Sequence, residues 1–352
     1  MYKPTGKIFG LVPALILAVA IAGPAQAARH HAAVRHHATA NKASQSINEK
    51  MVEEQVLLDR AGFSPGVIDG RGGGNTDKAL HVFQQVNGLP VGPLDQATAA
   101  RLAQTVEAQA LAQYTIAPQD VAGPFVQQIP KDFAQMAALP RLDYQSPREL
   151  LAEKFHMSED LLAALNPGKN LAQAGTVITV ANVGGPDPAA VAEAGKPGQK
   201  AQRQPAGSGS SGGGDRAARI VVDKRTQTVA VYGADNRLLA FYPATVGSTE
   251  KRAPSGTFQV RDVVRNPDYT YNPTYAFKGQ HATQPVKVPP GPNNPVGLVW
   301  IGLNAKGYGI HGTPDPDKVG KTQSHGCVRL TNWDALALAR LVKKGTQVDF
   351  VG

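Results

Sequence analysis

The spacing of apolar residues divides the chain into a front part with a helical period and a rear part with a period of two. Over residues 51–103, apolar side chains recur every three or four positions in three segments. Residues 62–66 would end the first segment, Thr76 is placed to cap the second, and Asn87-Gly88 would end it. We therefore predict a small three-helix bundle over residues 51–103.

Residues 141–182 show a second, shorter pattern. An apolar stretch at residues 142–144 predicts a strand, Ser146 and Ser158 are placed to cap two helices, and residues 176–181 predict a closing strand. This order of strand, helix, helix and strand predicts a small α+β module. Residues 104–140 have no place in this pattern, and we interpret them as a connecting segment.

Residues 183–216 are rich in Ala, Gly, Pro, Ser and Gln, and they include an uninterrupted run of Gly and Ser at residues 207–214. A segment with so few apolar side chains cannot build a packed core. We predict a flexible linker here.

The rear part, residues 217–352, alternates apolar and polar residues, which predicts strands. The predicted strands cover residues 219–223, 228–232, 238–246, 257–264, 297–303, 308–311 and 347–351. One helix interrupts them, capped by Thr331 or Asn332, with Asp334 in its first turn and residues 343–345 at its end. The pattern predicts a mainly β domain of antiparallel sheets with one helix.

Residues 269–295 of this rear part are rich in Tyr, Pro, Asn and Gly. Long loops without regular structure are often functional in folded domains. We predict that this segment is such a loop and forms a lid over a cleft.

The first 27 residues have the pattern of a secretory signal peptide. Lys3 and Lys7 precede an apolar run at residues 8–22, and residues 25–27 supply the small side chains of a cleavage site. The run is shorter than the roughly 20 residues that span a bilayer, which disfavours the alternative, a retained membrane anchor. We predict cleavage after Ala27, export to the periplasm or the cell-wall space, and no stable membrane insertion of the mature chain.

Residues 28–50 carry four histidines among alanines, namely His30, His31, His36 and His37. Metal binding is the alternative interpretation, but nothing near these histidines could orient the ligands of a metal. We predict a disordered arm.

The composition limits the classes of protein that the chain can belong to. Its 352 residues carry a formal net charge of +9 and a single cysteine, so two or three small domains must fold without a disulfide. A basic exported chain is attracted to anionic polymers of the cell envelope or to nucleic acid. The basic residues are scattered and not interleaved with aromatic residues, so we expect no nucleic-acid partner.

The only cysteine, Cys327, lies among groups that could activate a thiol. A thiol ionises near neutral pH only beside an imidazole, a cation or oriented backbone N–H groups. His311, His325 and Arg329 are close to Cys327 in the sequence, and Gly326 leaves room for a substrate carbonyl to approach. This setting favours a nucleophile over an inert buried thiol.

The residues around Cys327 carry a family resemblance. His311-Gly312-Thr313, followed by Ser324-His325-Gly326-Cys327-Val328-Arg329-Leu330-Thr331-Asn332, resembles the catalytic domain of the L,D-transpeptidases (the YkuD-like family), bacterial enzymes that cross-link peptidoglycan through an acylated cysteine. The run at residues 289–297 also resembles that family. The resemblance covers roughly the last third of the chain.

The front modules resemble domains that bind the cell wall. Residues 51–103 resemble the three-helix type of peptidoglycan-binding domain, with its Gly-Phe-x-Pro-Gly-x-Ile-Asp-Gly turn at residues 62–70. Residues 141–182 resemble a LysM domain, a glycan-binding fold, but lack the usual Gly-Asp before the first helix; a structural spacer is the alternative. On a flexible linker, such modules would raise the local concentration of substrate at the catalytic domain.

The resemblance implies roles in the reaction for four residues. Cys327 is the nucleophile and His311 the general base. Arg329 and Asn332 are the candidates for substrate binding, Arg329 through a substrate carboxylate. An ion pair within the protein is the alternative for Arg329, and Asn332 is also placed to fix a loop by hydrogen bonds.

Four further residues are expected to support the site. Backbone N–H groups around Gly326 and Cys327 would stabilise the oxyanion, and Gly312 belongs to the same supporting set. Ser324 is expected to fix the loop by hydrogen bonds, and His325 to shape the loop or the electrostatic field at the thiol.

The implied function is that of a peptidoglycan L,D-transpeptidase. Cys327 would form an acyl-enzyme with a tetrapeptide stem, releasing D-alanine, and an amine acceptor would resolve it, which cross-links or remodels the cell wall and so affects cell shape. Peptidoglycan stem peptides and glycan are the expected partners, and carbapenem β-lactams the expected covalent inhibitors. The sequence leaves the acceptor and the oligomeric state open.

Several alternatives differ in their chemistry. Water as the acceptor gives an L,D-carboxypeptidase, and a lipoprotein amine gives an enzyme that anchors a lipoprotein to the wall. A non-catalytic peptidoglycan-binding protein is the alternative from another class. The signature of a papain-type protease is absent, and His281, His311 and His325 lack the acidic helix motif of a zinc hydrolase, so no metal and no cofactor are expected.

Overall fold

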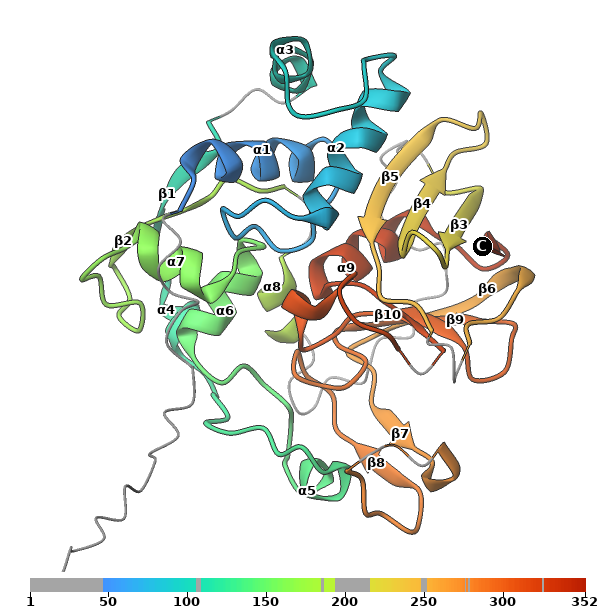
Figure 1. The fold of residues 1–352 in the computed structure, drawn as a ribbon. Coiled ribbons are helices and arrows are strands. Elements are labelled where there is room, and N and C mark those ends of the chain that lie inside the picture. Colours follow the sequence, from blue (N-terminus) through green and yellow to red (C-terminus); the bar gives the residue numbers. More distant parts are fainter. Residues whose placement is uncertain are drawn as a thin grey trace, which may run out of the picture. The chain divides into compact units, whose positions relative to one another are not determined.

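The computed structural model describes residues 47–105, 109–184, 187–193, 216–247, 252–275, 277, 279–324 and 326–352 (Figure 1). The predicted signal peptide, most of the predicted arm, most of the predicted linker and His325 lie outside these residues. None of the helices formed by the described residues is both long enough and apolar enough to cross a membrane.

Three helices open the described chain, as the helical period predicts: α1 (Glu49–Arg60), α2 (Gly74–Val86) and α3 (Gln96–Thr105). Leu58, Phe83 and Leu102 are buried together between them. The predicted cap of the second helix is wrong, because α2 begins at Gly74. Thr76 lies inside the helix, and its hydroxyl accepts a hydrogen bond of 3.3 Å from the buried side chain of Gln55.

The second module contains a two-stranded antiparallel sheet of β1 (Leu111–Thr115) and β2 (Val177–Ala181). Four helices lie between these strands in sequence: α4 (Pro118–Val121), α5 (Phe133–Ala137), α6 (Pro147–Lys154) and α7 (Glu159–Leu165). The predicted helix caps are present, since the hydroxyls of Ser146 and Ser158 each accept a backbone N–H of their own helix at 3.1 Å.

The first strand of this module was predicted in the wrong place. Residues 142–144 are buried but form no strand, because their backbone groups bond to loops instead: Leu142 donates to Pro290 and accepts from Asn293. The strand that pairs with β2 is β1, which lies in the segment predicted to be a connection. Its residues are only partly buried, so its apolar pattern is weak.

A short helix, α8 (Pro188–Glu193), lies within the segment predicted to be a flexible linker. Ala189 and Ala192 are buried, and the carboxylate of Asp187 accepts the backbone N–H of Ala189 at 2.8 Å. Small side chains can pack closely without supplying large apolar residues. The flexible-linker prediction is therefore wrong for residues 188–193.

The rear domain is built on an eight-stranded sheet, in the order β11-β10-β9-β6-β12-β3-β4-β5. Its strands are β3 (Arg219–Asp223), β4 (Thr228–Tyr232), β5 (Leu238–Pro243), β6 (Gly256–Arg265), β9 (Val299–Leu303), β10 (Gly309–His311), β11 (Val328–Arg329) and β12 (Gln347–Val351). Neighbouring strands are antiparallel except for the parallel pairs β12–β3 and β10–β11. The predicted mainly β architecture is confirmed.

One α-helix, α9 (Asn332–Leu341), interrupts the described strands of the rear domain. Thr331, not Asn332, is its cap, because the Thr331 hydroxyl accepts the Asp334 N–H at 3.1 Å. The helix ends at Leu341, before the two lysines that were expected in its last turn.

The segment 269–295 is not the irregular loop that was predicted. It contains an antiparallel hairpin of β7 (Tyr269–Tyr271) and β8 (Val286–Val288), together with a short 3-10 helix, Pro273–Tyr275. Phe133 of α5 packs against this hairpin, with ring centroids 5.5 Å from Tyr269 and 4.9 Å from Tyr271.

The front modules and the rear domain share one hydrophobic core. A single cluster of buried apolar side chains includes Val52 of α1, Leu151 of α6, Ile178 of β2 and Ile220 of β3. The described residues from 47 to 352 accordingly form one compact unit. This differs from wall-binding modules that move freely on a flexible tether.

The packing of the second module on the rear domain predicts a strong effect at Gly291. Its φ of +145° disfavours L side chains, and a Cβ there would lie 2.2 Å from the carbonyl oxygen of Leu142. We expect Gly291→Ala to lower the free energy of unfolding by about 2 kcal/mol or more, measured by urea titration.

Gly74→Ala is the matched control for this variant, because a Cβ at Gly74 meets no atom within 4 Å. Equal unfolding midpoints for the two variants would contradict the close packing of Leu142 on residue 291.

Candidate functional site

The candidate site lies at one edge of the eight-stranded sheet, where β10 pairs with β9 on one side and with β11 on the other. His311 is opposite Trp300 of β9 and opposite Arg329 of β11. Cys327 directly precedes β11, two residues before Arg329. Because side chains alternate along a strand, we expect Cys327, His311 and Arg329 to lie on the same face of the sheet.

His311 is held in one orientation. Its side chain is buried, its Nδ1 lies 2.6 Å from the carbonyl oxygen of Gly312, and its ring stacks on Trp300 with centroids 5.5 Å apart and an angle of 19°. A carbonyl only accepts hydrogen bonds, so Nδ1 carries the proton and Nε2 keeps its lone pair. The neutral ring is thereby prepared to accept a proton at Nε2.

The electrostatic surroundings keep this imidazole neutral. Burial and the positive charge of Arg329 lower the pKa of His311 to about 3, against the opposing effect of the bond to Gly312. A buried cation is disfavoured, and a second cation nearby adds to that effect.

The thiol of Cys327 is kept neutral for a related reason. Burial raises the pKa of the Cys327 thiol, and the Gly309 N–H and the charge of Arg329 oppose this effect. The Sγ atom lies 3.8 Å from the carbonyl oxygen of Gly307. A neutral thiol and a neutral imidazole are therefore the resting state, not a thiolate–imidazolium pair.

Ser324 fixes the loop that carries the thiol. Its hydroxyl donates to the Cys327 carbonyl at 2.5 Å and accepts the Gly326 N–H at 3.1 Å. Gly326 has a φ of +115°, which a glycine adopts readily. Because the Gly326 N–H is already bonded, the expectation that it serves as an oxyanion donor does not fit this arrangement. His325 lies outside the described residues.

Arg329 is half-buried beside the thiol. Its backbone is fixed by two hydrogen bonds to Thr245, each of 2.9 Å. Within the described part of the chain, no ion pair engages its guanidinium, although the charge of Asp315 acts on it from a distance. The described residues therefore do not support the alternative of an ion pair within the protein.

Asn332 is buried within the protein, which corrects the prediction that it binds substrate. Its side chain is fully buried at the start of α9. Its oxygen accepts the Leu298 N–H at 3.0 Å, and its nitrogen donates to the Glu153 carboxyl at 3.0 and 3.1 Å and to the Pro292 carbonyl at 3.3 Å. These bonds occupy both the oxygen and the nitrogen of the amide. Asn332 therefore holds parts of the protein together and does not bind a substrate.

Gly312 has two functions in this arrangement. Its carbonyl orients His311, and its missing side chain admits the Asn332 amide, since a Cβ there would lie 2.3 Å from the Asn332 oxygen. Asn332, Gly312 and His311 therefore form a chain of direct contacts.

Two residues of the site were missed by the sequence analysis. Trp300 covers one face of the His311 ring, and Glu153 of α6 reaches Asn332 from the second module. The alternation at residues 297–303 predicts that Trp300 lies on a strand. The residue opposite Trp300 depends on the register between β9 and β10, which the sequence does not give. Glu153 carries no sequence signal, because a Glu beside Lys154 is typical of any exposed helix.

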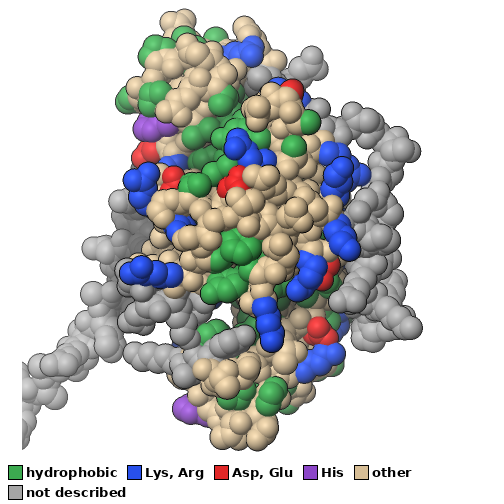
Figure 2. Space-filling model, turned by 90° about the vertical axis from the view of Figure 1, so that its right-hand side faces the viewer, with side chains coloured by type: hydrophobic (Ala, Val, Ile, Leu, Met, Phe, Trp, Pro, Cys, Tyr) green, Lys and Arg blue, Asp and Glu red, His purple; other side chains and the backbone are tan. Residues whose placement is uncertain are grey.

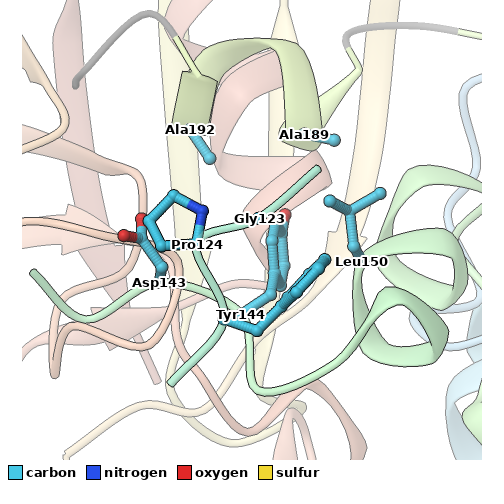
Figure 3. A pocket seen from close by; sticks show the side chains of 8 residues that line it. Gly123, Pro124, Asp143, Tyr144, Leu150, Ala189 and Ala192 are labelled. Carbon is cyan, nitrogen blue, oxygen red and sulfur yellow. The ribbon is translucent and has the colours of Figure 1, made fainter. Parts of the chain in front are cut away.

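A separate pocket lies in the second module (Figure 3). Gly123, Pro124, Asp143 and Tyr144 line it together with Leu150 and Ala192. It contains none of the predicted site residues. The described residues also contain no group of three or more His, Cys, Asp or Glu side chains that could hold a metal ion.

The protonation states of the pair predict how Cys327 reacts with a simple alkylating agent. We expect alkylation by iodoacetamide to be slow near pH 7 and to accelerate through pH 9 and above, because burial raises the pKa of the thiol. The rate is measured by intact-protein mass spectrometry across the pH range.

Cys327→Ser is the control, since this variant has no cysteine to label. A fast rate that stays constant from about pH 5 to pH 8 would indicate a thiolate–imidazolium pair and would contradict the neutral resting state.

Comparisons with known proteins point to one family. Residues 217–350 match the family model of the L,D-transpeptidase catalytic domain, and residues 48–102 match that of a peptidoglycan binding domain. The chain is 35% identical over 134 residues to YqjB of Bacillus subtilis (strain 168), whose name assigns it to the L,D-transpeptidases; the match covers 37% of this chain and 68% of YqjB. It is 31% identical over 137 residues to YbiS of Escherichia coli (strain K12), also named for this family, with 38% and 44% covered.

Solved structures of L,D-transpeptidases are also similar to part of the chain. L,D-transpeptidase 3 from Mycobacterium tuberculosis, in complex with a faropenem-derived adduct, has 18% identity and a TM-score of 0.32, with 39% of this chain and 60% of that chain covered. An L,D-transpeptidase from Mycobacterium smegmatis has 21% identity and a TM-score of 0.31, with 40% and 60% covered. The chain thus spans less than two thirds of these solved chains.

The relation to YqjB extends over more than two thirds of that protein, and the catalytic-domain model matches the part of this chain that contains both His311 and Cys327. The chain belongs to the L,D-transpeptidase family.

Proposed function

We propose that the protein is a peptidoglycan L,D-transpeptidase in which Cys327 is the nucleophile and His311 the general base. The observation that carries the proposal is the placement of the two side chains on one face of the paired strands β10 and β11, with His311 fixed in the tautomer that accepts a proton. The family membership supplies the reaction class.

The reaction follows from this arrangement in two balanced halves. The Cys327 proton passes to Nε2 of His311 as the sulfur attacks a carbonyl of the donor stem peptide, between diaminopimelate and D-alanine. The C–N bond breaks, the D-alanine amine leaves with the proton from His311, and a thioester remains. An acceptor amine then attacks the thioester carbonyl, so that a new C–N bond forms and the C–S bond breaks, and the amine's proton passes through His311 to the leaving sulfur.

Arg329 supports substrate binding more than proton transfer. Its charge stabilises a Cys327 thiolate and destabilises a His311 imidazolium, so the two effects on transfer between them oppose each other. A planar guanidinium can instead form a bidentate contact with a substrate carboxylate, and stem peptides carry such groups. The Cys327 N–H is the backbone donor that we assign to the oxyanion, because Ser324 occupies that of Gly326.

The front modules supply wall binding in this proposal. The bundle at residues 48–102 matches a peptidoglycan binding domain, and the LysM-like assignment of residues 141–182 rests on the helices α6 and α7 followed by β2. The net charge of +9 favours anionic wall polymers. On the face that Figure 2 shows, Lys and Arg side chains are spread out and not gathered in one patch. Export by the signal peptide would bring the protein to this substrate.

Muropeptides with tetrapeptide stems provide the direct test. We expect the wild type to form dimers cross-linked between two diaminopimelates, Cys327→Ala to form none, and His311→Gln to be at least about 100-fold slower because it lacks the base. Liquid chromatography with mass spectrometry resolves the products.

The other products distinguish the alternatives. Tripeptide without dimers would identify water as the acceptor, and dimers only with an added lipoprotein amine would identify wall anchoring. A wild type that changes no substrate, while still binding peptidoglycan, would overturn the catalytic proposal in favour of a binding protein.

Carbapenems test the nucleophile without any peptidoglycan. The carbonyl of the β-lactam is a target for the same sulfur, so we expect the intact mass to rise by one carbapenem in the wild type and not in Cys327→Ala. An unmodified mass in a sample whose thiol is still free would count against Cys327 as an acylated nucleophile.

A further inference from the structure

The carboxyl of Glu153 connects the second module with the catalytic domain. Glu153 is buried on α6, and both of its oxygens lie close to the Asn332 amide nitrogen, at 3.0 and 3.1 Å. The hydroxyl of Tyr144, in the same module as Glu153, also contacts it at 3.2 Å. Glu153, a residue type that is usually charged and exposed, is thus buried next to the Asn332 amide of the catalytic domain.

The contacts continue from Asn332 to the catalytic base. The Asn332 oxygen accepts the Leu298 N–H at 3.0 Å, and it fits against Gly312, where a Cβ would lie 2.3 Å from it. The Gly312 carbonyl in turn accepts the Nδ1 proton of His311 at 2.6 Å. The Asn332 amide therefore sets where the Gly312 backbone can lie, and that backbone sets the tautomer of His311.

The same helix holds the loop beside Asn332. Glu149 of α6 accepts a hydrogen bond of 2.8 Å from the side chain of Asn293, whose nitrogen also donates to the Asp143 carbonyl at 3.0 Å. The backbone of Leu142 bonds to Pro290 and Asn293. Residues 290–298 are thus fixed from the second module on one side and by Asn332 on the other.

We propose that Glu153 is a positioning residue for the catalytic base, and that the second module completes the active site through its contact with Asn332. The inference rests on the proposed function of His311. It assigns the second module a part in catalysis, in addition to the wall binding that its resemblance implies.

The protonation of Glu153 decides which variant should preserve the contact. Burial and the neighbouring charge of Glu149 raise the pKa of Glu153 to about 8, so its carboxyl is mostly protonated at neutral pH. An amide has the same shape and also offers an oxygen to Asn332. Glu153→Gln should therefore keep the contact with Asn332. Glu153→Leu removes the hydrogen-bond acceptor. Glu153→Asp shortens the side chain by one methylene and so moves the carboxyl away from Asn332.

The first experiment compares these variants in turnover of tetrapeptide muropeptides by the full chain. We expect kcat to fall at least tenfold in Glu153→Leu and Glu153→Asp with little change in KM, and to stay within threefold of the wild type in Glu153→Gln. Ser64→Ala is the matched control, because it removes another buried bond to α9, 3.0 Å long, at Asp334 instead of Asn332. Its kcat should be unchanged.

A second measurement does not depend on activity. The ¹⁵N chemical shifts of labelled histidine, with His311 assigned by its loss in His311→Gln, report the tautomer of the ring. We expect a fixed Nδ1–H tautomer in the wild type and in Glu153→Gln, and a mixture of tautomers in Glu153→Asp. Thermal unfolding identifies any variant that fails to fold, and if Glu153→Leu fails, Glu153→Asp decides.

The outcomes separate the two proposals. A wild type without turnover or carbapenem acylation overturns the proposed function, while the tautomer shift still tests the positioning role. Normal kcat and an unchanged tautomer in folded Glu153→Asp would overturn the positioning role alone. A loss in Glu153→Gln as large as that in Glu153→Asp would also overturn it, because the hydrogen bond to Asn332 would then not be the cause.

Discussion

The parallel pairing of β10 with β11 is the contact on which the proposed site depends, because it sets Arg329 opposite His311 and brings Cys327, which directly precedes β11, to the same edge of the sheet. Parallel neighbours cannot be joined by a tight turn, so the chain needs a long connection between them. Hydrogen bonds hold that connection: the Thr245 hydroxyl donates to the Lys318 carbonyl at 3.2 Å, and the Asn75 amide, from the front bundle, donates to the Val319 carbonyl at 2.9 Å. The position of Cys327 therefore depends on contacts far from it in sequence.

Burial decides the protonation of Cys327 and His311 more strongly than the nearby charge does. Arg329 acts on both groups and favours the anionic sulfur while it disfavours the cationic ring, whereas burial disfavours both ions. A neutral thiol is a weak nucleophile and is protected from side reactions. In the proposed mechanism, the thiol is activated when the substrate carbonyl is in place, because its proton moves to His311 as the new bond forms. The Gly312 carbonyl contributes by keeping Nε2 unprotonated.

The sequence was sufficient where pattern and local chemistry determine structure. Alternating residues such as Ile220, Val222, Val229 and Val231 lie buried on β3 and β4, and the motif around Cys327 indicates the family. It was insufficient where tertiary contacts decide. β1 is only partly buried, so its pattern is weak, and α8 packs through alanines that also occur in linkers. The amide of Asn332 is chemically suited to a substrate or to a buried partner, and only the fold selects Glu153.

The interface between the front modules and the rear domain explains why they form one unit. Asp334 of α9 accepts the Ser64 hydroxyl at 3.0 Å, and burial, together with Asp59, raises the pKa of Asp334. The ring of His156 stacks on Trp333 with centroids 5.1 Å apart. A buried polar pair such as Ser64 and Asp334 is stable only while both partners stay in place, since an unpartnered buried group costs about 1–3 kcal/mol. Separating the modules would expose apolar surface and break these contacts together, and it would also remove the Glu153 carboxyl that holds the Asn332 amide against Gly312.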